Sequence, residues 1–263
     1  MIRWCAYCQR YQGDVEPLDD YSVTHTICQS CVAQGALLRP VPPSIKAIQT
    51  FLSSIARSGE EPGLTAAEVV AQGDALGLDP ADLLLGVVQP VLHQIGDRWA
   101  HAEATIAEEH RVSALCSLVI QTMIARETDL AALRERQPLA VLLVVAEGNQ
   151  HTLGAQVLEV LLLRHHVPTY AVYPALPAHE IVALARRLRP RVVAISAALP
   201  EQLPSASIVA EQLSAQPPTE RPLVVVGGRA LAGGPSLPAG SPLIACNDFH
   251  ALLELASSAP AAP

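Results

Sequence analysis

Hydrophobic positions in the C-terminal half of the chain switch between continuous runs and helical spacing. Six of the seven residues 139–145, LAVLLVV, are branched aliphatics, and this length and β-branching predict a strand buried on both faces. The period then changes, because apolar residues recur at helical spacing from Leu153 to Leu162. A strand, a short polar loop and a helix in this order predict the first unit of a parallel α/β sheet.

Similar units follow along the chain. We predict further strands over 168–172, 191–199, 222–230 and 243–246. One helix is predicted over 179–188, a second lies between the third and fourth strands, and a third runs from the last strand to about residue 256. Five such strands predict a flavodoxin-like parallel sheet over residues 137–256. The remaining tail 257–263, SSAPAAP, has no means of packing and is predicted to be disordered.

Residues 44–134 have helical periodicity throughout and predict a four-helix bundle. An amphipathic helix is predicted over 45–56, and the capping boxes TAAE at 65–68 and TIAE at 105–108 predict the starts of two others. Between them, Asp79 and Pro80 predict the N-terminus of a helix whose apolar stripe runs to Trp99, with a kink at Pro90. The segments 39–44 and 135–138 are predicted linkers.

Four of the six cysteines lie in the first 31 residues as two Cys-x-x-Cys pairs with 19 residues between them: Cys5, Cys8, Cys28 and Cys31. This spacing is typical of a tetrahedral structural zinc site, and two disulfides or a redox pair are the alternative. His25 is a further possible ligand. A module of residues 1–38 is too small for a sizeable core, so metal binding would supply much of its folding energy. We expect its core to be separate from that of the other domains.

Composition and charge exclude several classes of function. The formal net charge is −8, with 17 basic against 25 acidic residues, and this argues against direct DNA binding, which needs clustered positive charge. Apolar runs fall short of the ~18–20 residues of a membrane span. The first residues lack the apolar stretch of a signal peptide. We therefore expect a soluble cytoplasmic protein.

Small or polar motifs follow three of the predicted strands. His151 and Gly154 come after the first strand, Ser196 ends the third, and Gly227 and Gly228 end the fourth. The carboxyl ends of parallel strands meet at one edge, where open α/β sheets bind ligands, so these residues would line a narrow slot. The alternative for each alone is structural: a polar residue at a helix start and loosely packed glycines.

These motifs resemble the cobalamin-binding domain, whose signature is Asp/Glu-x-His-x-x-Gly, then Ser-x-Leu, then Gly-Gly. The resemblance implies that His151 is the lower axial ligand of cobalt and that the displaced nucleotide tail enters the slot. Asn149 replaces the acidic residue that binds the imidazole in the family, and Ala198 replaces the leucine, so we expect a weaker or differently tuned cobalt–imidazole bond. The cofactor-binding residues implied here are Asn149, His151, Thr152, Gly154, Ser196, Ala198, Gly227 and Gly228.

The bundle before the sheet resembles that of two kinds of relative, corrinoid carriers and light-sensing regulators of the CarH/LitR type. The regulators carry a tryptophan, nine residues and Glu-His, and here Trp99 precedes Glu109 and His110 by the same interval. The alternative is a core tryptophan and an exposed polar pair. The resemblance implies that Trp99 and Glu109 surround the adenosyl group of adenosylcobalamin, whose cobalt–carbon bond light breaks.

One position departs from the regulators. Their tryptophan is followed directly by a histidine that takes the upper cobalt site after photolysis, whereas here Ala100 follows and His101 comes one residue later. Their DNA-binding domain has no counterpart in this sequence, and the four-cysteine module stands in its place.

We hypothesise a non-enzymatic, cobalamin-binding photosensory or ligand-sensing protein that also binds zinc and signals through a protein partner or self-association. Adenosylcobalamin is the favoured cofactor, and neither DNA nor membrane is an expected partner. The alternatives are a corrinoid carrier for methyl transfer, whose cobalt must stay open to methyl donors, and a photosensor that holds a bilin or haem.

Overall fold

The structure is a computed structural model of the chain and describes all residues except 35–43, 61–62, 128–138, 232–236, 238–239 and 259–263. It divides into two compact units, Met1–Met123 and Ile124–Pro263. Most of the two predicted linkers and of the predicted tail lies outside the described residues. Within the described residues, no helix is long and apolar enough to cross a membrane.

The second unit is built on a five-stranded parallel sheet of order β5-β4-β6-β7-β8. This is the flavodoxin-like order, so the predicted fold class is confirmed. The strands are β4 (Val141–Val145), β5 (Thr169–Val172), β6 (Val192–Ser196), β7 (Leu223–Gly227) and β8 (Leu243–Ala245).

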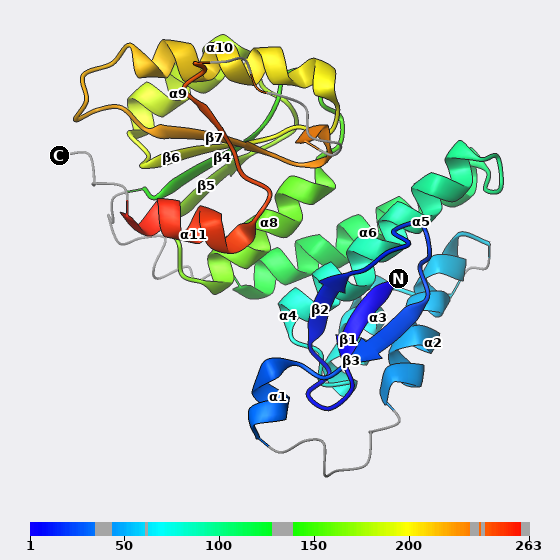
Figure 1. Cartoon of the computed structure of the whole chain (residues 1–263). Helices are drawn as coiled ribbons and strands as arrows, with labels where there is room; N and C mark the ends of the chain where they lie inside the picture. Colours follow the sequence, from blue (N-terminus) through cyan, green and yellow to red (C-terminus); the bar gives the residue numbers. More distant parts are fainter. Residues whose placement is uncertain (35–43, 61–62, 128–138, 232–236, 238–239, 259–263) are drawn as a thin grey trace. The chain divides into compact units, whose positions relative to one another are not determined.

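Helices cover both faces of this sheet (Figure 1). Helices α9 (Ala178–Leu188) and α10 (Leu203–Ser214) pack on one face, and α8 (Leu153–Arg164) and α11 (Phe249–Ser258) pack on the other. Each face of the sheet packs in its own hydrophobic core, and successive residues of β4 point into opposite cores: Leu142 lies in the first and Leu143 in the second. All five residues of β4 are buried. The continuous aliphatic run arises because both faces of the strand are covered.

The first unit contains the predicted four-helix bundle. Thr65 and Glu68 form the predicted capping box, and Asp79 caps the third helix, whose second half begins next to Pro90. The bounds are α2 (Ser44–Ala56), α3 (Ala66–Ala75), α4 (Pro80–Leu83) continued by the π turn η3 (Leu84–Val88) and by α5 (Gln89–Ala100), and α6 (Ile106–Glu127). Short 3-10 turns are η2 (Arg57–Gly59) in this unit and η4 (Pro200–Gln202) and η5 (Arg229–Leu231) in the other.

The helix irregularity lies before Pro90 rather than at it. Proline has no N–H to donate to the carbonyl four residues earlier, and its ring needs room there. The wider π turn over Leu84–Val88 occupies that part of the helix.

The N-terminal segment forms a small sheet that packs on this irregular turn. Strands β1 (Ile2–Cys5), β2 (Tyr11–Asp14) and β3 (Val23–Thr26) have the order β2-β1-β3 and are followed by α1 (Gln29–Ala33). Trp4 is 0% exposed, and a Cβ on Gly86 would lie 2.3 Å from its Cζ2 atom. The expectation of a separate core for this module is therefore wrong, because its largest side chain is buried against the helices.

Candidate functional site

Three of the predicted site motifs meet at one edge of the five-stranded sheet. In the register of the parallel strands, Ser196 at the end of β6 pairs with Val145 on one side and with Gly227 on the other. The Ala146 N–H donates to the Ser196 carbonyl at 3.0 Å. The loop that carries His151 therefore starts beside the serine and glycine loops, as the strand order predicts.

Asn149 fixes this loop from inside. Its side chain is fully buried, its Nδ2 donates to the Ser196 carbonyl at 3.1 Å, and its Oδ1 accepts from the His151 N–H at 2.9 Å. Both bonds are made to backbone, which differs from the imidazole contact of the family's acidic residue. The imidazole of His151 is left exposed just before α8.

The glycines of the site have two different functions. A Cβ on Gly227 would lie 2.4 Å from the Cys246 carbonyl oxygen, and one on Gly228 would lie 2.4 Å from that of Ala197. The backbones of neighbouring strand ends pack so closely that both positions need glycine, and Gly228 also has a positive φ of 108°. Gly154 has no atom within 4 Å of such a Cβ, so the first turn of α8 stays open to a ligand.

Two side chains that the sequence patterns did not identify hold the remaining loops. Gln202 is buried, and its Oε1 accepts from the N–H groups of Ala198 and Leu199 at 2.8 and 3.1 Å. The Asn247 Oδ1 accepts from the Gly228 N–H at 2.7 Å. The position of Gln202 in the turn after a proline is a local signal that could have identified it, whereas no local signal identified Asn247.

Thr152, a predicted site residue, is partly buried and directly precedes α8. Its hydroxyl oxygen accepts from Gln156 Nε2 at 3.3 Å.

The predicted residues of the helical unit flank the turn between α5 and α6. Trp99 is the next-to-last residue of α5 and is 52% exposed. The alternative interpretation of Trp99 as a core residue is therefore wrong. Glu109 lies in the first turn of α6 and His110 directly follows it. Thr105 and Glu108 form the predicted capping box at this helix start, where Glu108 Oε2 accepts from the Thr105 N–H at 2.6 Å. Trp99 and Glu109 thus stand at the two sides of one short turn.

His101 is held in a defined tautomer. Its Nδ1 lies 2.8 Å from the backbone carbonyl of Asp97, and a carbonyl can only accept, so Nδ1 carries the proton. In the neutral imidazole, Nε2 then carries the lone pair, the form in which an imidazole ligates metals. The neighbouring Glu109 accepts from Ser113 Oγ at 2.6 Å, and His110 Nε2 lies 3.6 Å from the Glu109 carboxylate.

The four N-terminal cysteines form a compact thiol cluster. Cys5 ends β1, Cys28 precedes α1 and Cys31 lies within it, and the four sulfur atoms are all within 4.8 Å of one another. The Sγ atoms of Cys8 and Cys28 are 3.7 Å apart. Tetrahedral zinc with ~2.3 Å bonds to sulfur requires sulfur separations of about 3.8 Å, so the cluster fits this ion.

The pKa values of these thiols also fit a cation site. Burial raises the pKa of Cys5, but the N–H groups of Cys28, Cys8 and Tyr7 outweigh it and lower the pKa to about 6. Desolvation raises the pKa of Cys8 to about 12, with the neighbouring thiols adding to the rise. A second thiolate next to the first is unfavourable without a positive charge, and a metal ion supplies that charge.

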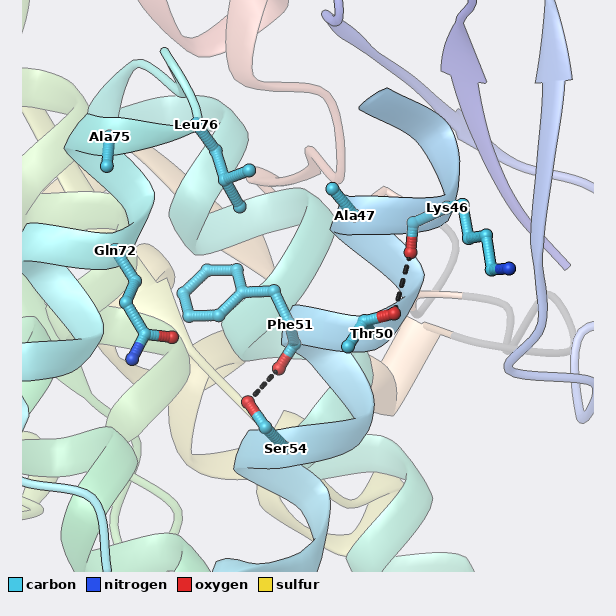
Figure 2. A pocket seen from close by; sticks show the side chains of 8 residues that line it. All are labelled: Lys46, Ala47, Thr50, Phe51, Ser54, Gln72, Ala75 and Leu76. Atoms are coloured by element: carbon cyan, nitrogen blue, oxygen red, sulfur yellow. Dashed lines mark hydrogen bonds between the residues drawn. The ribbon is translucent and has the colours of Figure 1, made fainter. Parts of the chain in front are cut away.

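A groove of about 640 Å³ lies between α2 and α3, and no predicted site residue lines it (Figure 2). Two of its hydroxyl groups are already bonded within α2, Thr50 to the Lys46 carbonyl and Ser54 to the Phe51 carbonyl. We assign it no chemistry. It is lined by Lys46, Ala47, Thr50, Phe51, Ser54, Gln72, Ala75 and Leu76.

Residues 64–122, the stretch from α3 to α6, match the family model described as a B12 binding domain. No curated protein matches the sequence. Among solved structures, the monomethylamine corrinoid protein of Methanosarcina barkeri is 14% identical with a TM-score of 0.62, over 80% of this chain and 97% of that one.

Two further structures are less similar in fold. The methanol:cobalamin methyltransferase complex MtaBC from Methanosarcina barkeri is 14% identical, over 90% of this chain and 95% of that one, with a TM-score of 0.40. A cobalamin-binding protein from Desulfitobacterium hafniense is 17% identical, over 77% and 95%, with a TM-score of 0.36. Of these three structures, only the monomethylamine corrinoid protein has a TM-score above 0.5. Together with the family match over residues 64–122, this shared fold supports a cobalamin-binding protein.

Proposed function

We propose that this protein is a cobalamin-dependent light sensor that binds adenosylcobalamin and signals through protein contacts. The observation that carries the proposal is the exposed Trp99 with Glu109 and His110 across one turn, inside the segment that matches a B12 binding domain. A tryptophan that is 52% exposed at a helix end is suited to covering an apolar ligand face with its ring.

The residues of the sheet unit would bind the lower face of the cofactor. His151 would ligate cobalt through its exposed imidazole, and the loop is kept in place by the two backbone bonds of Asn149. Gly154 leaves room for a large ligand at the start of α8, and the loops of Ser196 and Gly228 would receive the nucleotide tail.

Bound adenosylcobalamin would supply a cobalt–carbon bond that green light cleaves. The vacated position would be taken either by water or by His101, whose Nε2 carries the lone pair in the neutral imidazole that donates from Nδ1 to the Asp97 carbonyl. The remaining residues bind and orient the cofactor, and we assign no catalytic residue.

A corrinoid carrier for methyl transfer is the second candidate, because the neighbour with the matching fold is named a monomethylamine corrinoid protein. The upper face separates the two functions. A carrier leaves cobalt open to methyl donors, whereas Trp99 and Glu109 would close it.

Absorption spectra of the purified protein test the proposal. The protein is reconstituted with adenosylcobalamin, methylcobalamin, haem or a bilin, and spectra are recorded before and after green light. We expect adenosylcobalamin to bind with an imidazole-ligated spectrum that illumination converts to a stable new form. His151→Ala should change the dark spectrum, and His166→Ala, which removes an imidazole beyond the other end of α8, should not.

Each contrary outcome selects another function. Bound adenosylcobalamin that survives illumination excludes the light sensor and favours the carrier. Binding of haem or a bilin without cobalamin excludes both.

A further inference from the structure

The four-cysteine module contacts the helix that carries Trp99 in two separate places. The first is the start of that helix, where Trp4 packs on Gly86, and where Arg10 Nη1 and the Tyr11 N–H bond to the Asp82 carboxylate, each at 2.9 Å. Asp82 is buried, so this is an anchored contact rather than a surface ion pair.

The second contact lies at the other end of the helix. Tyr21, just before β3, donates its hydroxyl hydrogen bond to the Asp97 carboxylate in the last turn of α5. Both side chains are partly buried. Residues 80 to 100 of a helix span about 30 Å, so the module holds this helix near both of its ends.

Asp97 connects the module to the predicted cofactor residues. Its carboxylate is bound by Tyr21, while its backbone carbonyl accepts from His101 twice, from the backbone N–H at 3.0 Å and from Nδ1 at 2.8 Å. The same turn carries Trp99. A displacement of Asp97 would move the carbonyl that sets the tautomer and direction of the His101 ring.

The π turn explains why the end of α5 needs contacts with the module. A π turn interrupts the regular hydrogen bonds of an α-helix and is a site where helices bend. The direction of the segment after the turn is therefore set less firmly by the helix and more by its contacts. Trp4 packs against this turn at Gly86, and Tyr21 holds the segment beyond it at Asp97.

We propose that the four-cysteine module positions the end of α5, with Tyr21 and Asp97 as positioning residues for His101 and Trp99. The part of this inference that concerns the cofactor rests on the proposed function. Neither residue needs to touch the cofactor. The module is then a structural support of the upper face as well as a metal site.

The test compares Tyr21→Phe with Tyr11→Phe. Both variants lose one tyrosine hydroxyl of the same module, but the Tyr11 hydroxyl bonds to Asp14 within the module, at 2.9 Å. In the protein without cofactor, we expect Tyr21→Phe to speed amide hydrogen exchange over residues 97–104 by up to about tenfold, the effect of losing one hydrogen bond. Tyr11→Phe should leave these amides unchanged.

With adenosylcobalamin, Tyr21→Phe should weaken binding about threefold to tenfold and reduce the histidine-ligated fraction after light. The dark spectrum should be kept, because His151 belongs to the other unit. Asp97→Ala should reproduce both effects, and the double variant Tyr21→Phe/Asp97→Ala should show no larger effects than either single variant. Asp97→Asn retains an acceptor for Tyr21 and should behave largely like the wild type.

The outcomes separate this inference from the proposed function. Unchanged exchange over 97–104 in Tyr21→Phe overturns the positioning of the helix end. Faster exchange with unchanged affinity and unchanged light-state spectrum overturns its role toward the cofactor. A wild-type protein that binds no cobalamin defeats the proposed function, while the exchange measurement still decides whether the module positions α5.

Discussion

Asn149 illustrates how one side chain can preserve a motif position while changing its chemistry. An asparagine donates and accepts at once, and here it links the Ser196 carbonyl to the His151 N–H across the sheet edge. A carboxylate has no proton to donate. The resemblance predicted that this asparagine gives a weaker or differently tuned cobalt–imidazole bond, and the structure adds that its side chain bonds to two backbone groups.

We predict that Asn149→Asp lowers the free energy of unfolding by about 1–3 kcal/mol at pH 7, since a buried carboxylate would face the Ser196 carbonyl oxygen. Burial raises the pKa of such an aspartate above its unfolded value of about 3.9, so the loss should shrink as pH falls and the protonated acid regains a donor. Urea unfolding at pH 7 and pH 5 measures this. Gln150→Glu makes the same change at an exposed neighbour and should cost little. Equal stability of Asn149→Asp and wild type would show that the side chain can turn toward the imidazole.

At the scale of elements, the contact of Trp4 with the π turn depends on a missing side chain. We predict that Gly86→Ala destabilises the first unit by about 1–3 kcal/mol, because the new methyl group would meet the Trp4 ring and force it to move. Gly96→Ala is the matched control, on the same helix with no atom within 4 Å of its added Cβ. It should stabilise by up to about 1 kcal/mol through helix propensity. Thermal unfolding of both variants is the measurement, and a neutral Gly86→Ala would contradict the packing.

The capping box at the start of α6 should make this turn sensitive to acid. Hydrogen bonds from the Thr105 backbone and hydroxyl lower the pKa of Glu108, so its stabilisation is present above the unfolded pKa of about 4.3 and is lost as pH falls through the lower folded value. Glu108→Gln should remove this pH dependence, and Glu103→Gln in the preceding turn should keep it. Amide exchange over residues 106–109 at pH 3 to 6 tests the expectation. Identical pH profiles for wild type and Glu108→Gln would refute it.

Helices, strands and caps were predictable because their signals are local. The run of aliphatics gave β4, the boxes at Thr65 and Thr105 gave two helix starts, and strand order then brought Ser196 beside Gly227. Contacts between distant segments were not predictable. Periodicity shows which face of a helix is apolar but not its partner, so the bond from Tyr21 to Asp97 had no readable signature. Pro90 predicted an irregular helix but not that the irregularity would be a π turn before it.

At the scale of the whole molecule, the first 34 residues belong to the same compact unit as the helices. Two closely spaced cysteine pairs are typical of modules that fold on their metal, and such a module is expected to fold alone. Trp4 contradicts that expectation, because its side chain completes the packing around Gly86 and is 0% exposed. We therefore expect metal binding at the four cysteines to be coupled to the stability of the helices.

We predict that the protein binds about one zinc ion per chain and that Cys8→Ser or chelation loses it. Unfolding of the module would remove Trp4 from its contact with the helices. Removing a buried tryptophan lowers the free energy of unfolding by about 3–5 kcal/mol. This is enough to lower the unfolding temperature of the unit by roughly 10 °C or more. Amide exchange should rise over residues 84–88 while β4 stays protected, since β4 lies in the other unit. Cys246→Ser, which removes a thiol from the sheet unit, should change neither zinc content nor exchange in the helices. If the helices keep their protection after zinc is removed, the module folds independently and its contact with the helices adds no stability.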